Sequence, residues 1–568
     1  MAEEIISKVK ARTNTVLDGV PRVSQNFHQS DLIIQSLLAQ ELSKEANNYM
    51  RGILDGLGEA AAGKMNSLSL DADKNSPELI KRNPLGENID EIKFHPAYWE
   101  LMEIAVKSEM FRVKWEPSLR KKFEKERNQM GFAAGFLYCM SEMGQYCPLC
   151  MTDGVARLID LHCDPEDKDR LMPHIYTDAA EDLMTGAMFL TEKTGGSDVG
   201  ANIVSATPMG DGMYHLNGEK WFCSNANGDI IFVLARTDKS VPGIKGISIF
   251  LVEKYLEDGS RNPIEIVRLK DKLGVRSMAS AECILTNTVG KLVGEEFQGF
   301  RVMADMVNLS RIYTAMGSLA GSRRAIIESY QFLNQRQSFG KPTMEHALVR
   351  DKFREVGSMY VANFYMVWRA IKALDNAENG DEKEENLLRL LTPMIKKSVS
   401  EEGVFIAREA MELMGGVGYI EDTVMPKIIR DLMVNPIWEG AGNIMILDML
   451  RAAKKSDGLA VIREEIASSL TNTDQGDSVL EQLDELYGLI AGLSSLGQDE
   501  MESTAKPVFE KLTEFYKLSL LYQNLSPESE KWVLPAISFF EERVLNQPLK
   551  PRTPLSKEAV GELIAWTY

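Results

Sequence analysis

The stretch MFLTEKTGGSDVG, residues 188–200, contains residue types that suit binding an anionic ligand through the backbone. Gly195 and Gly196 form a pair that allows backbone conformations other residues resist and lets a ligand approach the main chain. Small, glycine-rich loops hold phosphate groups through backbone N–H groups. A plain turn between two strands has much the same composition, so the loop alone leaves both interpretations open.

The common nucleotide and catalytic motifs do not describe this loop. No Gly-Lys-Ser/Thr follows it, as a P-loop requires, and the β-type sequence after it does not fit a GxGxxG fingerprint. The chain has no G-x-S-x-G elbow and no histidine pair at the spacing of a zinc site, so no metal is predicted. A flavin or nucleotide bound here therefore needs a binding-site geometry that differs from these motifs.

A second candidate is Cys147-Pro-Leu-Cys150, which has the spacing of a redox dithiol or half a zinc site. No second pair of this kind exists, and the surrounding stretch FLYCMSEMGQYCPLCMTDGVARLI is apolar throughout. Thiols in such surroundings act as small hydrophobes. We therefore expect these two cysteines to be core residues. The chain starts without a recognisable export signal, so we expect no disulfides and a cytoplasmic location.

Length and charge limit the classes of function. A chain of 568 residues is too long for one core and predicts three or four domains. No segment approaches the roughly 18 apolar residues of a membrane span. The net charge of −19 argues against nucleic acid as a partner. The section from Asp457 to Tyr568 holds 19 acidic and 9 basic residues, which also disfavours contact with DNA.

The pattern along the chain predicts four domains, in the order helical, β, helical, helical. Residues 1–182 are mainly of helical character, with a polar linker expected near 66–78. Short β-prone runs with Gly, Asp and Asn between them predict a β domain at 183–292. Apolar residues three and four apart then predict long helices over 293–455 and an additional helical domain at 456–568.

Five motifs in order make the chain resemble the acyl-CoA dehydrogenase family. They are MFLTEKTGGSDVG, GEKWFCSNANGD, NQRQSFGKP, MELMGGVGYIED and IRDLMVNPIWEGAGNIM. The resemblance covers roughly residues 90–455. The segments TNTVLDGVP, IDEIKFHPAYWELM, CPLCMTDG and LKDKLGVRSMAS, together with the extra C-terminal section, are similar to the AidB-like branch of the family.

The resemblance implies a fold, a reaction and partners. The fold class is mainly α with a central β domain: an α-helical domain, a β-barrel-like domain, a four-helix domain and an extra helical domain. The reaction is FAD-dependent α,β-dehydrogenation of an acyl-CoA to the trans-2-enoyl-CoA, with electrons leaving through an electron-transferring flavoprotein. Because relatives share FAD between subunits, the resemblance also implies a homodimer or homotetramer.

The catalytic residue implied by the resemblance is Glu439, in NPIWEGAGN. A desolvated carboxylate can remove the α proton of the thioester, and Ile437 and Trp438 supply apolar cover while Gly440 leaves space. The alternative is a partly buried glutamate at a helix start. Some relatives place the base on the helix that here contains VNLSR, but Ser310 at the matching position cannot take that proton at neutral pH.

The resemblance also implies the cofactor-binding residues. Thr191 binds the flavin ring system, and Ser197 lies near the phosphate-bearing part of FAD or CoA, with Gly196 beside it. Trp221 stacks on the flavin, although a strand tryptophan is more often a core residue, and the register of Cys223 against Ser224 stays open. The full cofactor set is Thr191, Gly196, Ser197, Trp221, Phe222, Ser224, Arg336, Phe339, Gly415, Gly416, Gly440 and Asn443.

Some of these residues are implied to act between subunits or on CoA. Arg336 and Phe339 reach the FAD of a neighbouring subunit, and Gly415 and Gly416 hold its adenosine end, although a glycine pair after a helix equally serves as a cap. Arg311 helps to hold CoA, as does Ser197. Many relatives carry Asp three residues before that arginine, whereas this chain has Asn, which weakens the implication for CoA.

Two other functions remain open at this point. One is a flavin-containing stress or alkylation-response protein of the AidB type with little or no dehydrogenase turnover. The other is a lipid-sensing or scaffolding protein that keeps the acyl pocket without catalysis. The acidic C-terminal section disfavours a DNA-binding version of the first.

Overall fold

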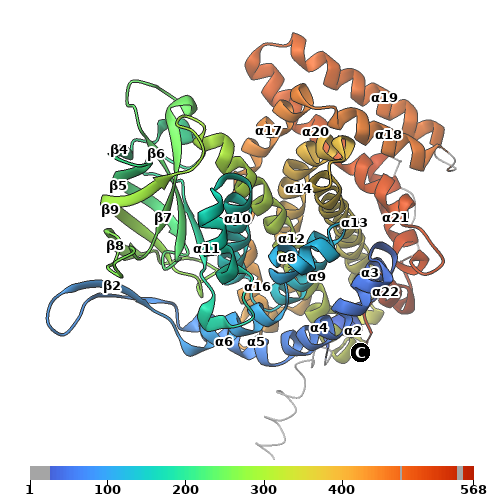
Figure 1. Cartoon of the computed structure of the whole chain (residues 1–568). Coiled ribbons are helices and arrows are strands. Elements are labelled where there is room, and N and C mark those ends of the chain that lie inside the picture. The colour runs from blue at the N-terminus through green and yellow to red at the C-terminus, as the bar shows by residue number, and fades with distance from the viewer. Residues whose placement is uncertain (1–25, 472, 474–475, 546–553, 568) are drawn as a thin grey trace, which may run out of the picture. The chain divides into compact units, whose positions relative to one another are not determined.

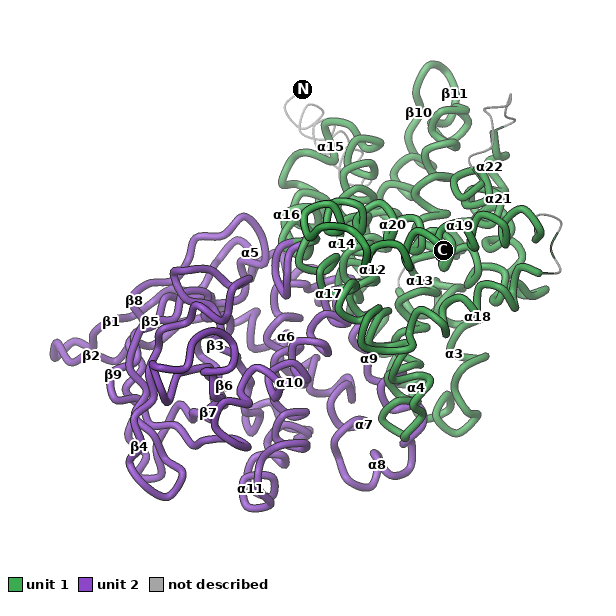
Figure 2. Tube along the Cα trace, turned by 90° about the horizontal axis from the view of Figure 1, so that it is seen from above, with its two compact units in different colours: residues 1–63, 315–436, 442–568 green, residues 64–314, 437–441 purple. Residues whose placement is uncertain are grey.

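The computed structural model describes residues 26–471, 473, 476–545 and 554–567. The TNTVLDGVP segment, residues 13–21, lies outside the described residues. The chain forms two compact units (Figure 2). Unit 1 consists of residues 1–63, 315–436 and 442–568, and unit 2 of residues 64–314 and 437–441. The domain boundaries predicted after residues 182, 292 and 455 stay predictions.

The first part of unit 2 is helical, as the pattern predicts, with one β hairpin. Its helices are α5 (Lys64–Lys74), α6 (Pro96–Lys107), α7 (Arg112–Trp115), α8 (Pro117–Lys122), α9 (Arg127–Cys139), α10 (Tyr146–His162) and α11 (Pro165–Ile175). The hairpin pairs β1 (Glu78–Arg82) with β2 (Asn88–Lys93). The linker expected near residues 66–78 is mostly wrong, because α5 continues to Lys74. Met65, Ser69 and Ala72 lie buried on one face of this helix.

A seven-stranded sheet follows in unit 2. Its strands are β3 (Gly186–Phe189), β4 (Ser205–Gly210), β5 (Met213–Ser224), β6 (Ile230–Arg236), β7 (Ile247–Glu253), β8 (Ile264–Leu269) and β9 (Ser280–Leu292). The order is β3-β6-β4-β5-β9-β7, and β8 pairs with β9. Because β6 also pairs with β7, the sheet closes on itself, which confirms the barrel-like β domain.

The burial pattern of the strands shows where the core of this sheet lies. All seven residues of β6, IIFVLAR, are buried, whereas half-buried and buried positions alternate over the first four residues of β5. Phe189, Leu216, Phe250, Cys223 and Cys283 belong to one buried cluster inside the sheet. Helix α10 packs on β3 and β6, and it lies beside the sheet in Figure 1. This packing fixes the strand from which the 190–204 loop starts.

Unit 1 contains most of the long helices. Its elements are α2 (Phe27–Ser30), α3 (Leu32–Glu41), α4 (Lys44–Ala62), the part of α12 (Gly299–Gln335) from residue 315 onward, β10 (Gln337–Ser338), β11 (Lys341–Pro342), α13 (Ala347–Glu378), α14 (Glu382–Met414), α15 (Gly416–Tyr419), α16 (Met425–Leu432) and α17 (Gly442–Lys455). The additional section adds α18 (Gly458–Leu470), α19 (Gly476–Gly492), α20 (Gln498–Gln523), α21 (Glu530–Val544) and α22 (Lys557–Ile564). The predicted fold class, mainly α with a central β domain, is confirmed.

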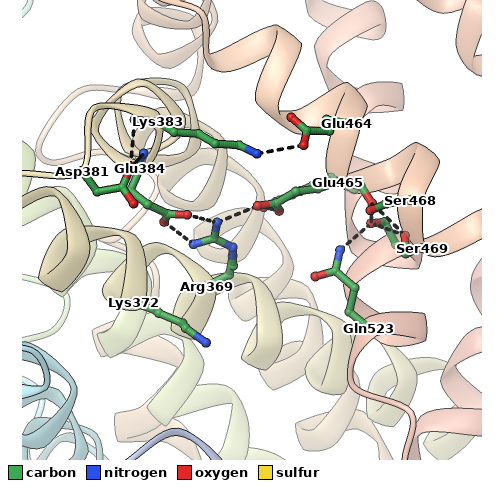
Figure 3. A network of polar contacts seen from close by, with 12 residues as sticks. Arg369, Lys372, Asp381, Lys383, Glu384, Glu464, Glu465, Ser468, Ser469 and Gln523 are labelled. Atoms are coloured by element: carbon green, nitrogen blue, oxygen red, sulfur yellow. Dashed lines mark hydrogen bonds and ion pairs between the residues drawn. The ribbon is translucent and has the colours of Figure 1, made fainter.

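The additional C-terminal helices pack on the long helices of their own chain. Helices α20 and α21 contact α13, and α18 contacts α14. Figure 3 shows the polar contacts that accompany this packing. Arg369 of α13 donates to both oxygens of Glu384 in α14 at 2.7 Å and to Glu465 of α18 at 2.6 Å. Helices α18, α20 and α21 of the acidic section therefore pack on the long helices of unit 1.

A buried ion pair joins both ends of the described chain within unit 1. Arg323 of α12 contacts both carboxylate oxygens of Asp31, at 2.7 and 2.8 Å, and the side chains of both residues are at most 1% exposed. The same guanidinium donates to the carbonyls of Ile564 and Ala565. Asp31 also caps α3 through its side chain. One cation thus holds an N-terminal helix and the C-terminal helix against α12.

No helix among the described residues is long and apolar enough to cross a membrane.

Candidate functional site

The glycine loop after β3 is shaped so that its main chain and one hydroxyl remain accessible. Gly195 has φ +115, a value that favours glycine. A Cβ on Gly196 would lie 2.9 Å from Thr191 Oγ1, so glycine at this position keeps the approach to that hydroxyl open. Gly196 and Ser197 are exposed, and Thr191 is half-buried. This small cradle suits a polar ligand that approaches backbone and hydroxyl together.

The structure brings Trp221 of β5 to the same place as this loop. The backbone N–H of Trp221 donates to the carbonyl of Thr191 at 2.9 Å. Lys270 Nζ lies 3.8 Å from the centroid of the Trp221 ring and 4.4 Å from that of Phe222, and it pairs with Glu282 at 2.8 Å. Phe222 is 54% exposed. An aromatic surface with a lysine against it therefore adjoins the glycine loop.

Cys223 and Ser224, whose register the sequence leaves open, lie in different surroundings on β5. Cys223 is fully buried in the core cluster of the sheet. Ser224 is half-buried, and its Oγ lies 3.3 Å from Ser280 Oγ. Lys272 donates to Ser280 Oγ at 3.2 Å and to the carbonyl of Met278 at 2.5 Å. The thiol of Cys223 therefore lies in the core, whereas the hydroxyl of Ser224 belongs to a polar cluster outside it.

Glu439 has an unusual backbone conformation. Its φ is +57, in the left-handed region that side-chain-bearing residues rarely adopt, and Gly440 follows with φ +103. Arg311 fixes this bend, since its Nε donates to the Glu439 carbonyl at 3.1 Å while Nη1 donates to Asn308 Oδ1 at 3.1 Å. Glu439 is half-buried. A strained backbone conformation at a partly covered carboxylate is typical of functional positions.

The two thiols of α10 lie close to this carboxylate. Burial raises the pKa of Cys147, the charge of Glu439 raises it further, and Lys272 opposes the effect. The pKa of Cys150 is also raised, mainly by burial, and its Sγ contacts Ser310 Oγ at 3.4 Å. Both thiols therefore stay protonated at neutral pH, and the six cysteines are free. Cys147 is half-buried rather than fully enclosed, and its proximity to Glu439 had no signal in the sequence.

The other predicted cofactor residues lie in unit 1. Phe339 stands between β10 and β11 with φ +49, and it is 98% exposed. Arg336 is exposed, and a Cβ on Gly415 would lie 3.7 Å from its Nη1. Gly415 itself has φ +64, so it ends α14 in a conformation that favours glycine. Gly416 and Asn443 are also exposed.

The structure therefore divides the predicted residues between the two units. In unit 2 it brings Thr191 to Trp221, and Arg311 to Glu439. In unit 1 it brings Arg336 to Gly415. Among the described residues, no group of three or more His, Cys, Asp or Glu side chains is arranged to hold a metal ion.

Two charged residues beside the predicted ones were not predicted from the sequence. Glu192 and Lys220, the immediate neighbours of Thr191 and Trp221, form a buried ion pair of 2.8 Å. Their signal was present in the motifs LTEK and GEKW, where each charged residue lies next to a predicted cofactor contact. Single charged residues beside a motif are common, so only the structure reveals the pairing.

Three family models cover most of the chain. The AidB N-terminal domain (adaptive response protein) matches residues 20–181. The middle domain of acyl-CoA dehydrogenases matches residues 187–288, and their C-terminal domain matches residues 298–454.

Individual relatives resemble the chain over most of its length. AidB of Escherichia coli (strain K12) is 33% identical over 474 residues, which cover 82% of this chain and 85% of that protein. The crystal structure of Caenorhabditis elegans ACDH-11 in complex with C11-CoA superimposes with a TM-score of 0.86 at 25% identity, covering 95% of this chain and 93% of that one. Bd2924 in its apo form gives a TM-score of 0.82 at 29% identity, covering 89% and 99%. The chain belongs to the acyl-CoA dehydrogenase family, in its AidB-like branch.

Proposed function

We propose that the protein is an FAD-dependent acyl-CoA dehydrogenase that converts an acyl-CoA thioester to its trans-2-enoyl form, with Glu439 as the general base. The observation that carries this proposal is the conformation of Glu439. Its left-handed backbone is held by Arg311, and a glycine follows directly. A chain accepts such strain where the direction of one side chain matters.

The chemistry required of Glu439 is removal of the α proton of the thioester. A carboxylate that is partly withdrawn from water holds a proton more tightly, which brings its basicity closer to what this step requires. Residue 439 is half-buried, and its carboxylate is proposed to be this base. The neighbouring thiol of Cys147, whose pKa is raised, remains neutral and does not compete for the proton.

The residues around the glycine loop fit FAD. The Thr191 hydroxyl, left accessible by Gly196, and the exposed main chain at Ser197 offer donors to a flavin ring and a phosphate. Trp221 and Phe222 offer the aromatic surface beside them. When bound, FAD would supply the hydride acceptor for the β carbon. The protein's own part is to bind this cofactor, to orient it and to take the α proton.

The residues in unit 1 support sharing of FAD between two copies of the chain. Phe339, at 98% exposed on a tight hairpin, has the form of an aromatic side chain that a second copy covers. Arg336 beside Gly415 offers a guanidinium fork, which suits a pyrophosphate better than a lysine does. We propose that these residues, with Gly416 and Asn443, bind the adenosine and phosphate portions of FAD in a homodimer or homotetramer.

An acyl-CoA is the proposed substrate, and the solved complex of ACDH-11 with C11-CoA supports this class. Ser197 and Arg311 are proposed to contact CoA. Arg311 already donates to the Glu439 carbonyl and to Asn308 Oδ1. It therefore also serves to hold the base in place. The electrons are proposed to leave through an electron-transferring flavoprotein.

An anaerobic titration of the purified yellow protein with a panel of acyl-CoAs, followed at the flavin absorbance, tests the proposal. The wild type is expected to bleach with at least one thioester. Glu439→Gln is expected to keep its colour and bind the same thioester but to lose bleaching, because the amide cannot accept the proton. Normal bleaching by this variant would refute the role of Glu439. A wild type that binds every thioester without bleaching would refute the dehydrogenase and favour a binding protein of the AidB type.

A further inference from the structure

We propose that Glu192, Lys220, Asn202 and Arg236 form a buried polar clamp that closes the 190–204 loop at its base and positions the residues that bind FAD. The inference rests on the proposed function for its ligand. The clamp itself consists of contacts within unit 2. None of its four members is a residue we propose to touch the cofactor.

The first half of the clamp is the Glu192–Lys220 pair. Both side chains are buried, at 3% and 0% exposed, and Lys220 Nζ lies 2.8 Å from Glu192 Oε1. Lys220 also donates to the carbonyl of Leu190 at 3.3 Å, where the loop begins. Glu192 accepts from the backbone N–H groups of Ile203 at 2.6 Å and Val204 at 3.2 Å, where the loop ends. One ion pair thus holds both ends of the loop.

The second half reinforces the same closure. Asn202 Nδ2 donates to the Leu190 carbonyl at 2.8 Å, which joins the two ends again. Arg236, at the end of β6, donates through Nε to the Asn202 carbonyl at 2.6 Å and through Nη2 to the Gly200 carbonyl. Its Nη1 donates to the Val241 carbonyl at 2.7 Å. The loop is therefore attached to the sheet by side chains that are themselves buried.

The position of the clamp indicates its purpose. A buried ion pair is costly to desolvate, and apolar residues of similar volume often stabilise a fold as well or better. Charged groups here add directional bonds to the backbone on both sides of the exposed tip, which contains Gly196 and Ser197. Glu192 follows Thr191, and Lys220 precedes Trp221, and these neighbours share a backbone hydrogen bond of 2.9 Å. The clamp thus fixes the spacing between the loop and the aromatic strand.

The test compares variants of the clamp with a matched control. Glu192→Gln and Lys220→Met each break the ion pair, and Asn202→Ala removes only the bond to Leu190. Asp153→Asn is the control, because Asp153 pairs with Lys114 at 2.7 Å in the same unit, both side chains are 1% exposed, and neither belongs to the loop.

Two measurements are made on each full-length variant: hydrogen–deuterium exchange of peptides covering 190–204, and the Kd for FAD from flavin fluorescence. The clamp variants are expected to exchange at least about tenfold faster in this loop and to bind FAD at least about tenfold more weakly, the size of one lost charge-assisted hydrogen bond. Asn202→Ala, which is the least disruptive variant, is also expected to exchange faster in the loop and to bind FAD more weakly. The control variant is expected to lose thermal stability but to keep the exchange rate of the loop and the Kd for FAD of the wild type.

A double variant separates positioning from stability. Glu192→Leu/Lys220→Met replaces the pair by apolar side chains and leaves no unpaired charge, so it is expected to regain thermal stability over the single variants. It is not expected to regain loop protection or FAD affinity. Recovery of both readings in this double variant would overturn the clamp, as would single variants that exchange and bind like the wild type. If the wild type binds no FAD, the proposed function fails, while the exchange measurement still decides whether the clamp exists.

Discussion

Replacement of Glu439 by glycine tests whether the chain stores strain at the proposed base. Glu439 has φ +57, and an L-residue in the left-handed conformation costs roughly 1–2 kcal/mol. Glycine adopts this conformation freely, but its greater loss of conformational freedom on folding offsets roughly 0.5–1 kcal/mol. Alanine removes the carboxylate and keeps the Cβ that causes the strain. The difference between Glu439→Gly and Glu439→Ala therefore isolates the backbone, and we expect the glycine variant to be more stable by about 1 kcal/mol.

Calorimetric unfolding of the two variants at equal flavin content measures this difference. For a unit of this size, about 1 kcal/mol corresponds to roughly 2 °C in the unfolding midpoint. Gly440→Ala is the matched control, since Gly440 has φ +103 and a Cβ there adds strain instead of relieving it. The order expected is Glu439→Gly above Glu439→Ala, with Gly440→Ala below the wild type. If the glycine variant melts below the alanine variant, the backbone of residue 439 is not strained and the expectation from its conformation is wrong.

Three further predictions concern other parts of the molecule. Asp31→Asn leaves the Arg323 guanidinium buried without its carboxylate, so the free energy of unfolding of unit 1 is expected to fall by about 3–5 kcal/mol. The measurement is hydrogen exchange of the C-terminal helix, which is expected to become faster. Unchanged exchange would contradict this. Burial raises the pKa of Asp229 above its ordinary 3.8, although Thr185 donates to its carboxylate. A raised carboxyl pKa contributes stability that is lost as the pH rises through it, so the stability of Asp229→Asn is expected to increase relative to the wild type as the pH rises above about 4. A difference in urea denaturation that stays constant with pH would contradict this. Phe339→Ala, at a position 98% exposed, is expected to weaken FAD retention and also self-association, measured by analytical ultracentrifugation. Full retention of both would refute the proposed role of Phe339 between copies.

The general order of elements was predictable because it depends on local periodicity. The β-prone run IIFVLAR forms β6, and every residue of it is buried. Residues three and four apart predicted the long helices, and α13 and α14 have that form. The linker expected near 66–78 was wrong because tertiary packing there outweighs the local preference for a turn. Its Asn, Ser and Asp residues favour a turn locally, but Met65 and Ala72 pack on the core and stabilise a helix there.

The candidate site was predictable only in part. The motifs identified Thr191, Trp221 and Glu439 because the resemblance lies in short contiguous stretches. The proximity of Cys147 to Glu439 joins residues nearly three hundred positions apart, which no local pattern reports. The same holds for the left-handed conformation of Glu439, since glutamate has no intrinsic preference for it.

The sequence by itself determined the family, the fold class and the residue types available for chemistry, since these reside in contiguous motifs and in the spacing of apolar side chains. Only the tertiary structure decided which charges are buried together. Asp31 caps α3 while Arg323 lies within α12, and Glu192 and Lys220 lie on a loop and a strand. A charge leaves water at an acceptable cost only where the fold supplies its partner, and that partner is chosen by packing in three dimensions.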